Sequence, residues 1–132
     1  MIRQRRPNGQ AILEFVLVIP LLLGLLLILF DLGRITYYYS AINNAAREGA
    51  RYGIIFKDNP GDIEDAAIAA AVGVTGGAVT AVVNVTDPPP PADRIVTVTV
   101  SFTYVPATPF VGNLIGGGPG ITISSQAQMV AE

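Results

Sequence analysis

The chain has 132 residues, enough for one modest domain with an anchor but too few for two full cores. It contains no cysteine and no histidine, which excludes disulfides, the usual zinc sites and Cys–His nucleophile pairs. The net charge is −2, and beyond residue 51 two basic residues stand against seven acidic ones. This balance argues against nucleic-acid binding.

An apolar run from Ala11 to Phe30 lies near the N-terminus and is interrupted only by Glu14. As a helix it would be roughly 30 Å long, which matches the hydrocarbon thickness of a bilayer. We therefore predict a membrane span at about residues 11–30. The basic residues before it predict a cytoplasmic N-terminus and a translocated C-terminal part; they are Arg3, Arg5 and Arg6.

Helical spacing continues beyond the span and predicts one long helix from about Gln10 to about Tyr52. Pro20 predicts a kink or a locally freed carbonyl inside it. The consecutive tyrosines at 37–39 are interpreted as anchors in the headgroup region. One stripe of apolar and small residues follows the outer half; it comprises Ile35, Tyr38, Tyr39, Ile42, Ala45, Ala46, Gly49 and Ala50.

Small residues recur at spacings of three and four near the end of this helix: Ala46, Gly49, Ala50 and Gly53. Such a face allows another backbone to approach closely. The partner is either the protein's own sheet or a neighbouring subunit.

A second, short helix is predicted from Pro60 to Gly73, with Asp62 as N-cap and Gly73 as the C′ residue. The acidic residues of its first turn lack the ligand spacing of a calcium loop. They are interpreted as a solvated helix start that suits the helix dipole.

Three segments alternate apolar and polar residues and predict strands at Val79–Thr86, Arg94–Tyr104 and Ile121–Met129. This period of two is typical of antiparallel strands with one solvent-exposed face. The apolar face must be buried against another element, and the outer half of the long helix is available for this. The predicted fold class is therefore α+β, with a three-stranded antiparallel sheet packed on a long membrane-spanning helix beside a short second helix.

Two linkers complete the chain. Asp87–Asp93 is a polyproline connection that either holds two strand ends apart or binds a proline-reading partner. Pro106–Gly120 is too glycine-rich for regular structure and lacks the ending of a phosphate-binding loop. Its apolar residues either pack down or meet a partner; they are Phe110, Val111, Leu114 and Ile115.

Glu14 has three readings. Near the cytoplasmic boundary it is tolerable as a carboxylate that reaches the headgroups. A secretory signal peptide would explain the basic and apolar regions, but the run is long and no small-x-small cleavage site closes it. The third reading takes Gly9 and Gln10 into account: with Gln10 as the first residue of the mature chain, Glu14 is the fifth.

A basic leader, a glycine and a glutamate at mature position five resemble type IV pilin-like processing signals. The first 53 residues further resemble the TadE-like family of tight-adherence (Flp-type) pilus systems, and the β-rich tail is similar to it more weakly. The matching motifs are Glu14-Phe15, Pro20, Gly33-Arg34 and the Ala45–Arg51 segment. Gln10 departs from the pattern, because an N-terminal glutamine can cyclise and lose its ammonium charge.

The resemblance implies a minor pseudopilin with Gly9 and Gln10 as the processing site of a prepilin peptidase, and with Glu14 and Phe15 in assembly. Residues 1–9 would be a removed leader, 10–53 the long helix and 54–132 an extracytoplasmic domain. Implied partners are other pilins or pseudopilins, the inner-membrane assembly platform and the bilayer; no cofactor or metal is expected. An uncleaved, membrane-anchored adhesin or envelope subunit is the alternative, and no catalytic constellation predicts an enzyme.

Overall fold

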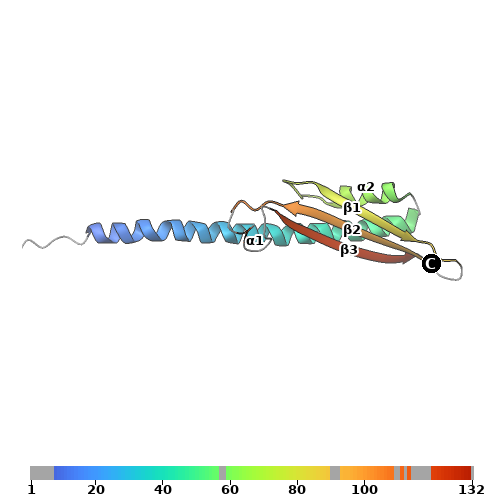
Figure 1. Cartoon of the computed structure of the whole chain (residues 1–132), viewed down its shortest axis with the longest axis horizontal. Coiled ribbons are helices and arrows are strands. Elements are labelled where there is room, and N and C mark those ends of the chain that lie inside the picture. Colours follow the sequence, from blue (N-terminus) through green and yellow to red (C-terminus); the bar gives the residue numbers. More distant parts are fainter. Residues whose placement is uncertain are drawn as a thin grey trace, which may run out of the picture.

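One helix, α1 (Asn8–Phe56), runs the length of the molecule in the computed structural model of the chain. The structure describes residues 8–56, 59–89, 93–108, 111, 113 and 120–131. Its 49 residues correspond to roughly 73 Å of helix. The inner half projects as a bare stem, and the outer half lies beneath the rest of the chain (Figure 1). The helix continues through Pro20, so the predicted long helix is confirmed and is slightly longer at both ends.

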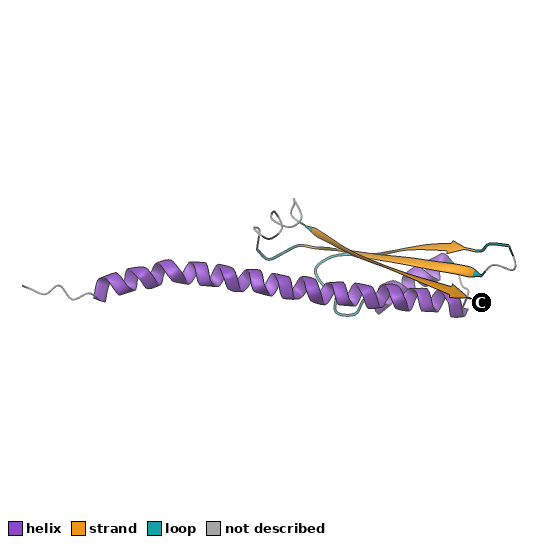
Figure 2. Ribbon diagram, turned by 90° about the horizontal axis from the view of Figure 1, so that it is seen from below, coloured by secondary structure: helices purple, strands orange, loops and turns teal. Residues whose placement is uncertain are grey.

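The outer half of α1 carries a second helix and a sheet, which confirms the predicted α+β class. The second helix is α2 (Pro60–Ala70), and the strands are β1 (Val79–Thr86), β2 (Arg94–Tyr104) and β3 (Ile121–Ala131). They form one antiparallel sheet in the order β1-β2-β3. Helix α1 covers β2 and β3, while α2 covers β1, all on the same face (Figure 2).

The core lies between this face of the sheet and the two helices. Alternate residues of β2 are buried, as the period of two predicts, and pair in register with β1 and β3, for example Val83 with Val98 and Val98 with Ala127. The fully buried members of the core include Ile42, Ala45, Ala46, Ala50, Ile63, Ala67, Val96, Val98 and Val100. Burial of these side chains is the main force that holds the sheet on the helix.

Two predictions about the tyrosines and the stripe were wrong. Tyr38 is not an interfacial anchor: it is 4% exposed, and its ring packs edge-on against Phe102 and Tyr104 at centroid distances of 5.2 and 5.4 Å. Its hydroxyl donates a hydrogen bond to the carbonyl of Thr75. Conversely, Tyr39 was assigned to the buried stripe and is 53% exposed. The helical period brings Tyr38, and not its neighbour, onto the face of Ile42.

The caps of α2 also differ from the prediction. Asn59 is the N-cap and Pro60 opens the helix, so Asp62 lies inside the first turn. Proline suits the first helical position because it has no amide hydrogen to leave unpaired and its φ is already helical. At the other end the helix stops at Ala70 with Ala71 as C-cap. Gly73, with φ +80°, is two residues beyond the cap and is not the C′ residue.

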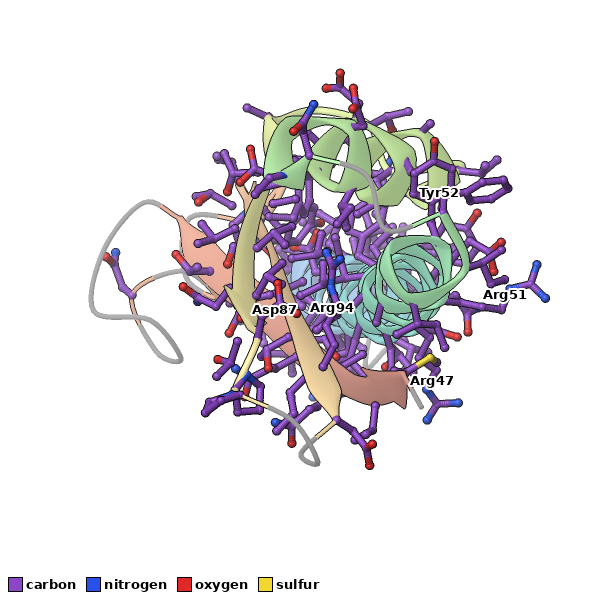
Figure 3. The ribbon with its side chains drawn as sticks, turned by 90° about the vertical axis from the view of Figure 1, so that its right-hand side faces the viewer. Arg47, Arg51, Tyr52, Asp87 and Arg94 are labelled. Atoms are coloured by element: carbon purple, nitrogen blue, oxygen red, sulfur yellow. The ribbon has the colours of Figure 1, made fainter. Side chains whose placement is uncertain are left out.

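The two linkers are described in part. The polyproline segment connects β1 to β2, and Asp87 and Arg94 face each other at its ends with 3.5 Å between Oδ1 and Nε (Figure 3). In the second linker, Val111 is buried at 2% exposure. The other apolar residues of that linker for which a packing role was considered lie outside the described residues; they are Phe110, Leu114 and Ile115.

Candidate functional site

The N-terminal motif occupies the first turns of the stem. Gly9 and Gln10 are the second and third residues of α1. The Gln10 side-chain amide donates a hydrogen bond to Oε1 of Glu14, one helical turn away, over 3.4 Å. Glu14 and Phe15 are both exposed, and Phe15 shows 64% of its surface. Within the described part of the chain no Lys or Arg pairs with Glu14. The carboxylate is therefore accessible to a group outside this chain. Arg3, Arg5 and Arg6 lie outside the described residues.

The stem has an exposed apolar surface on every side. Its most apolar 18 residues have no buried member, and α1 is the one helix among the described residues that is long and apolar enough to cross a membrane. Large side chains such as Leu17, Leu21 and Phe30 are more than 70% exposed. A surface of this kind requires lipid or other apolar helices around it.

The small-residue face lies against this protein's own domain. A Cβ atom built on Gly49 would be 2.6 Å from Cβ of Ala67, and one on Gly53 would be 2.9 Å from Cγ1 of Val96. Ala46 and Ala50 are fully buried in the same core. This face therefore positions α2 and the sheet on the helix, and it is not free for a neighbouring subunit.

A buried carboxylate marks the point where the stem meets the domain. Asp31 is 1% exposed, and Oδ1 accepts hydrogen bonds from the Tyr104 hydroxyl at 2.6 Å and the Ala107 amide at 3.1 Å. Its Oδ2 accepts from the Thr108 amide at 3.0 Å and from the Thr108 hydroxyl. We call these four residues the Asp31 cluster. It fastens the end of β2 and the segment after it to the helix one residue beyond the predicted span.

The electrostatics of the Asp31 cluster favour the ionised carboxylate. Burial by itself would raise the pKa of Asp31, but the hydrogen bonds from Thr108, Tyr104 and Ala107 outweigh it and lower the pKa from 3.8 to about 2. Burial and the hydrogen bond to Asp31 raise the pKa of the Tyr104 phenol, while the Arg34 guanidinium acts in the opposite direction. Tyr104 is therefore a donor to a charged acceptor, which is a strong type of hydrogen bond.

The Asp31 cluster predicts a pH dependence of stability. Because the pKa of Asp31 is lower in the folded state than its ordinary 3.8, its contribution is present above pH 3.8 and is lost as the pH falls through about 2. The shift corresponds to about 2 kcal/mol. Urea unfolding of the full chain in maltoside micelles should show a progressive loss on acidification from about pH 5, which reaches this size only below about pH 2. In Asp31→Asn this part of the pH dependence should be absent; an equal loss in both proteins would contradict the assignment.

The Asp31 cluster was not predicted from the sequence. The only available signal was a carboxylate directly after an apolar run. The partners of Asp31 are 73 to 77 residues away, and no spacing rule connects them.

The described residues contain no group of three carboxylate, His or Cys side chains that could hold a metal ion.

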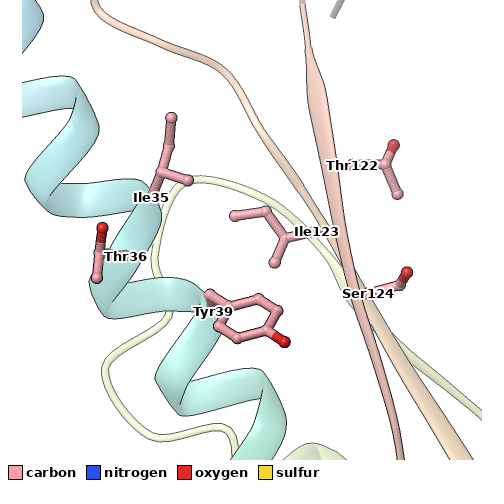
Figure 4. Close-up of a pocket in the computed structure, with 6 residues that line it drawn as sticks. All are labelled: Ile35, Thr36, Tyr39, Thr122, Ile123 and Ser124. Carbon is pink, nitrogen blue, oxygen red and sulfur yellow. The ribbon is translucent and has the colours of Figure 1, made fainter. Parts of the chain in front are cut away.

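A cleft of about 430 Å³ separates the helix from the edge strand next to the Asp31 cluster. Ile35 and Tyr39 of α1 face Ile123 of β3 across it, while the Thr122 and Ser124 side chains point away from the helix (Figure 4). Its lining residues include the hydroxyl groups of Thr36 and Tyr39, but none of them is charged, so no acid or base accompanies these hydroxyls there. The space between Ile35, Tyr39 and Ile123 is therefore a gap in the packing of the helix against β3.

A comparison with known protein families gives a match for one segment of the chain. Residues 9–51 match the family of TadE-like proteins, which covers less than half of the chain but most of α1. The match begins at Gly9 and includes Gln10, Glu14 and Phe15. Comparison with curated proteins and with solved structures gave no match. The family implies a component associated with a Tad pilus, in contact with other pilus components and the membrane.

Proposed function

Because residues 9–51 form a TadE-like segment, we propose that this protein is a minor pseudopilin of a tight-adherence (Flp-type) pilus. A prepilin peptidase releases it from residues 1–9 by cleavage after Gly9. The observation that carries the proposal is the family match beginning at Gly9, followed at the fifth mature position by an exposed carboxylate without a basic partner among the described residues. The role is structural, and we assign no reaction to the protein.

The proposed topology follows from charge and length. Arg3, Arg5 and Arg6 hold the N-terminus in the cytoplasm until cleavage, residues 11–30 span the inner membrane, and residues 54–132 lie outside it. Removal of the leader takes away the cationic anchor. The stem then remains in the bilayer through its apolar surface alone, and it can leave the bilayer if neighbouring stems replace the lipid.

Glu14 supports the assembly step in physical terms. Cleavage creates an α-amino group at Gln10, and in an apolar helix bundle this ammonium and Glu14 of an adjacent subunit attract strongly. The pair offsets its desolvation only when the two stems are in register, so it can set their stagger. The hydrogen bond from the Gln10 side chain already orients the carboxylate within one chain. Cyclisation of Gln10 would abolish the charge, so the mechanism requires that processing or N-methylation prevents it.

The proposal predicts the mass of the mature protein. When the full chain is produced in cells with a matching prepilin peptidase, intact mass spectrometry should show a chain that begins at Gln10. Gly9→Leu should keep the leader, because the peptidase needs a small residue there. A Cβ atom at Gly9 meets nothing within 4 Å, so we expect the variant to leave the described fold unchanged.

Gly33→Ala is the matched control, since it also replaces a helical glycine with open space around it, and it should be processed normally. A wild-type chain that still begins at Met1 would overturn the pseudopilin proposal in favour of an uncleaved adhesin or envelope subunit. Unchanged processing of Gly9→Leu would show that cleavage occurs at another residue.

A further inference from the structure

A second cleft lies at the junction of stem and domain, on α1 beside the turn that follows α2. It has a volume of about 370 Å³ and is bounded by Leu29 and Phe30 on the stem, by Arg34 and Tyr37 one turn further on, and by Gly73. Phe30 and Arg34 are four residues apart and therefore share one side of the helix. The cleft thus joins an apolar wall to a cation.

The charge inside this cleft is of one sign. Arg34 is the only ionised group among its lining residues, all of which the structure describes. The nearest carboxylate on the helix, Asp31, is 1% exposed and has both oxygens engaged by Tyr104, Ala107 and Thr108. Its charge is therefore largely compensated within the Asp31 cluster. Arg34 also lines a neighbouring cleft with Asp31 and Ala107, but it forms no ion pair within the part of the chain that the structure describes, so its charge is available to an anion.

The position of Arg34 along the helix is equally specific. No basic residue occurs between residue 8 and Arg34, and the next ones on α1 are Arg47 and Arg51, about 20 Å or more further out. Arg47 and Arg51 are both exposed, and Arg51 projects from the side of α1 that is turned away from the sheet (Figure 3). Arg34 lines the neighbouring cleft together with Asp31 and Ala107, which places it beside the domain. It therefore lies at the depth where the exposed apolar surface ends.

We propose that this cleft binds a phospholipid from the leaflet on the side of the outer domain. The lipid phosphodiester pairs with the Arg34 guanidinium, whose planar set of donors suits two phosphate oxygens at once. The Tyr37 hydroxyl, which lies beside Gly73, completes the polar end. One acyl chain lies along Leu29 and Phe30, which are 63% and 72% exposed.

Two observations favour a phospholipid as the occupant. The cleft is continuous with the exposed stem, so an acyl chain enters it from the bilayer without crossing water. The volume of the cleft is at the lower end of the range for ligand-binding sites. The cleft is therefore large enough for a lipid headgroup but not for a whole lipid. The inference rests on insertion of α1 in a membrane; it does not depend on cleavage after Gly9.

The test is native mass spectrometry of the full chain, purified in maltoside micelles with added dioleoylphosphatidylglycerol. The wild type should retain one lipid per chain. Arg34→Gln should lower the retained fraction about tenfold, because the phosphate loses its charged partner. Arg47→Gln, the same change further along the helix, should retain lipid as the wild type does. Dioleoylglycerol, which has the chains but no phosphate, should not be retained by any of these proteins.

Gly33→Leu provides a second variant that leaves Arg34 in place. A Cβ atom at Gly33 meets nothing within 4 Å and Gly33 lines the cleft, so we expect a leucine there to extend into the cleft. It should also abolish retention, and glycerol phosphate at millimolar concentration should not displace the lipid from the wild type. Equal retention by wild type and both variants, equal loss in Arg47→Gln, or a lipid-free dimer that fills the cleft would overturn the proposal. The same spectra show whether the chain begins at Met1 or Gln10, so failure here is distinguishable from failure of the proposed processing.

Discussion

Replacement of Asp31 by alanine is expected to lower the free energy of unfolding of the outer domain by about 3 kcal/mol. The variant removes a charged acceptor and leaves the Tyr104 hydroxyl and the Thr108 amide without a partner in a mostly buried place. Urea unfolding of the full chain in maltoside micelles, followed by tyrosine near-ultraviolet circular dichroism, measures the change. Tyr38 and Tyr104 make this signal sensitive to the core, because both rings are 4% exposed and in contact.

Partial replacements should rank in a definite order. Tyr104→Phe removes one hydrogen bond and should cost about 1 kcal/mol. Asp31→Asn keeps an acceptor for Tyr104 but offers an amide nitrogen to the donors of Thr108, so its cost should lie between those of the other two variants. The exposed Asp62→Ala is the matched control and should change stability by less than about 0.5 kcal/mol. A loss below about 1 kcal/mol in Asp31→Ala would mean that the Asp31 cluster does not hold the domain to the stem.

The regular parts of the fold could be predicted because local sequence and burial agree in them. The residues of β2 alternate strictly, and since one face of the sheet is buried, a shift by one residue would expose every valine of the strand. The stem could be predicted because an uncharged run of this length has few alternatives to a span. The covering of the sheet by α1 followed from the need to bury its dry face.

The features that were missed depend on contacts between distant residues or on a choice between neighbours. Asp31 differs from an ordinary flanking carboxylate only through partners more than 70 residues away. Tyr38 differs from Tyr37 and Tyr39 only in the side of the helix that it occupies, and a run of three tyrosines obscures that difference. For the proposed processing and assembly motif, the sequence suggests the residues and the structure shows that they are exposed. The proposed action requires partners outside this chain.

Replacement of Gly49 by valine is expected to destabilise the outer domain by about 3 kcal/mol, although valine has the higher helix propensity. The reason is space: a Cβ atom at this position would be 2.6 Å from Cβ of Ala67 and 3.2 Å from Cγ1 of Val98. These contacts can be relieved only if α2 and β2 move away from α1. Gly49→Ala should cost less, about 1–2 kcal/mol, because the same clash is partly offset by the better helix propensity of alanine.

Two further variants separate crowding from a general intolerance of substitution. Gly33→Ala, where a Cβ meets nothing within 4 Å, should stabilise α1 by up to about 1 kcal/mol, so the same change should have opposite signs at positions 33 and 49. Ala67→Gly removes the atom that Gly49→Ala would strike, so the double variant should be more stable than the sum of the single effects by about 1 kcal/mol. Additive effects would show that the two helices are not in contact there. If Gly49→Ala instead left stability unchanged and weakened association between subunits, the small-residue face would be an intermolecular surface, contrary to its burial in this fold.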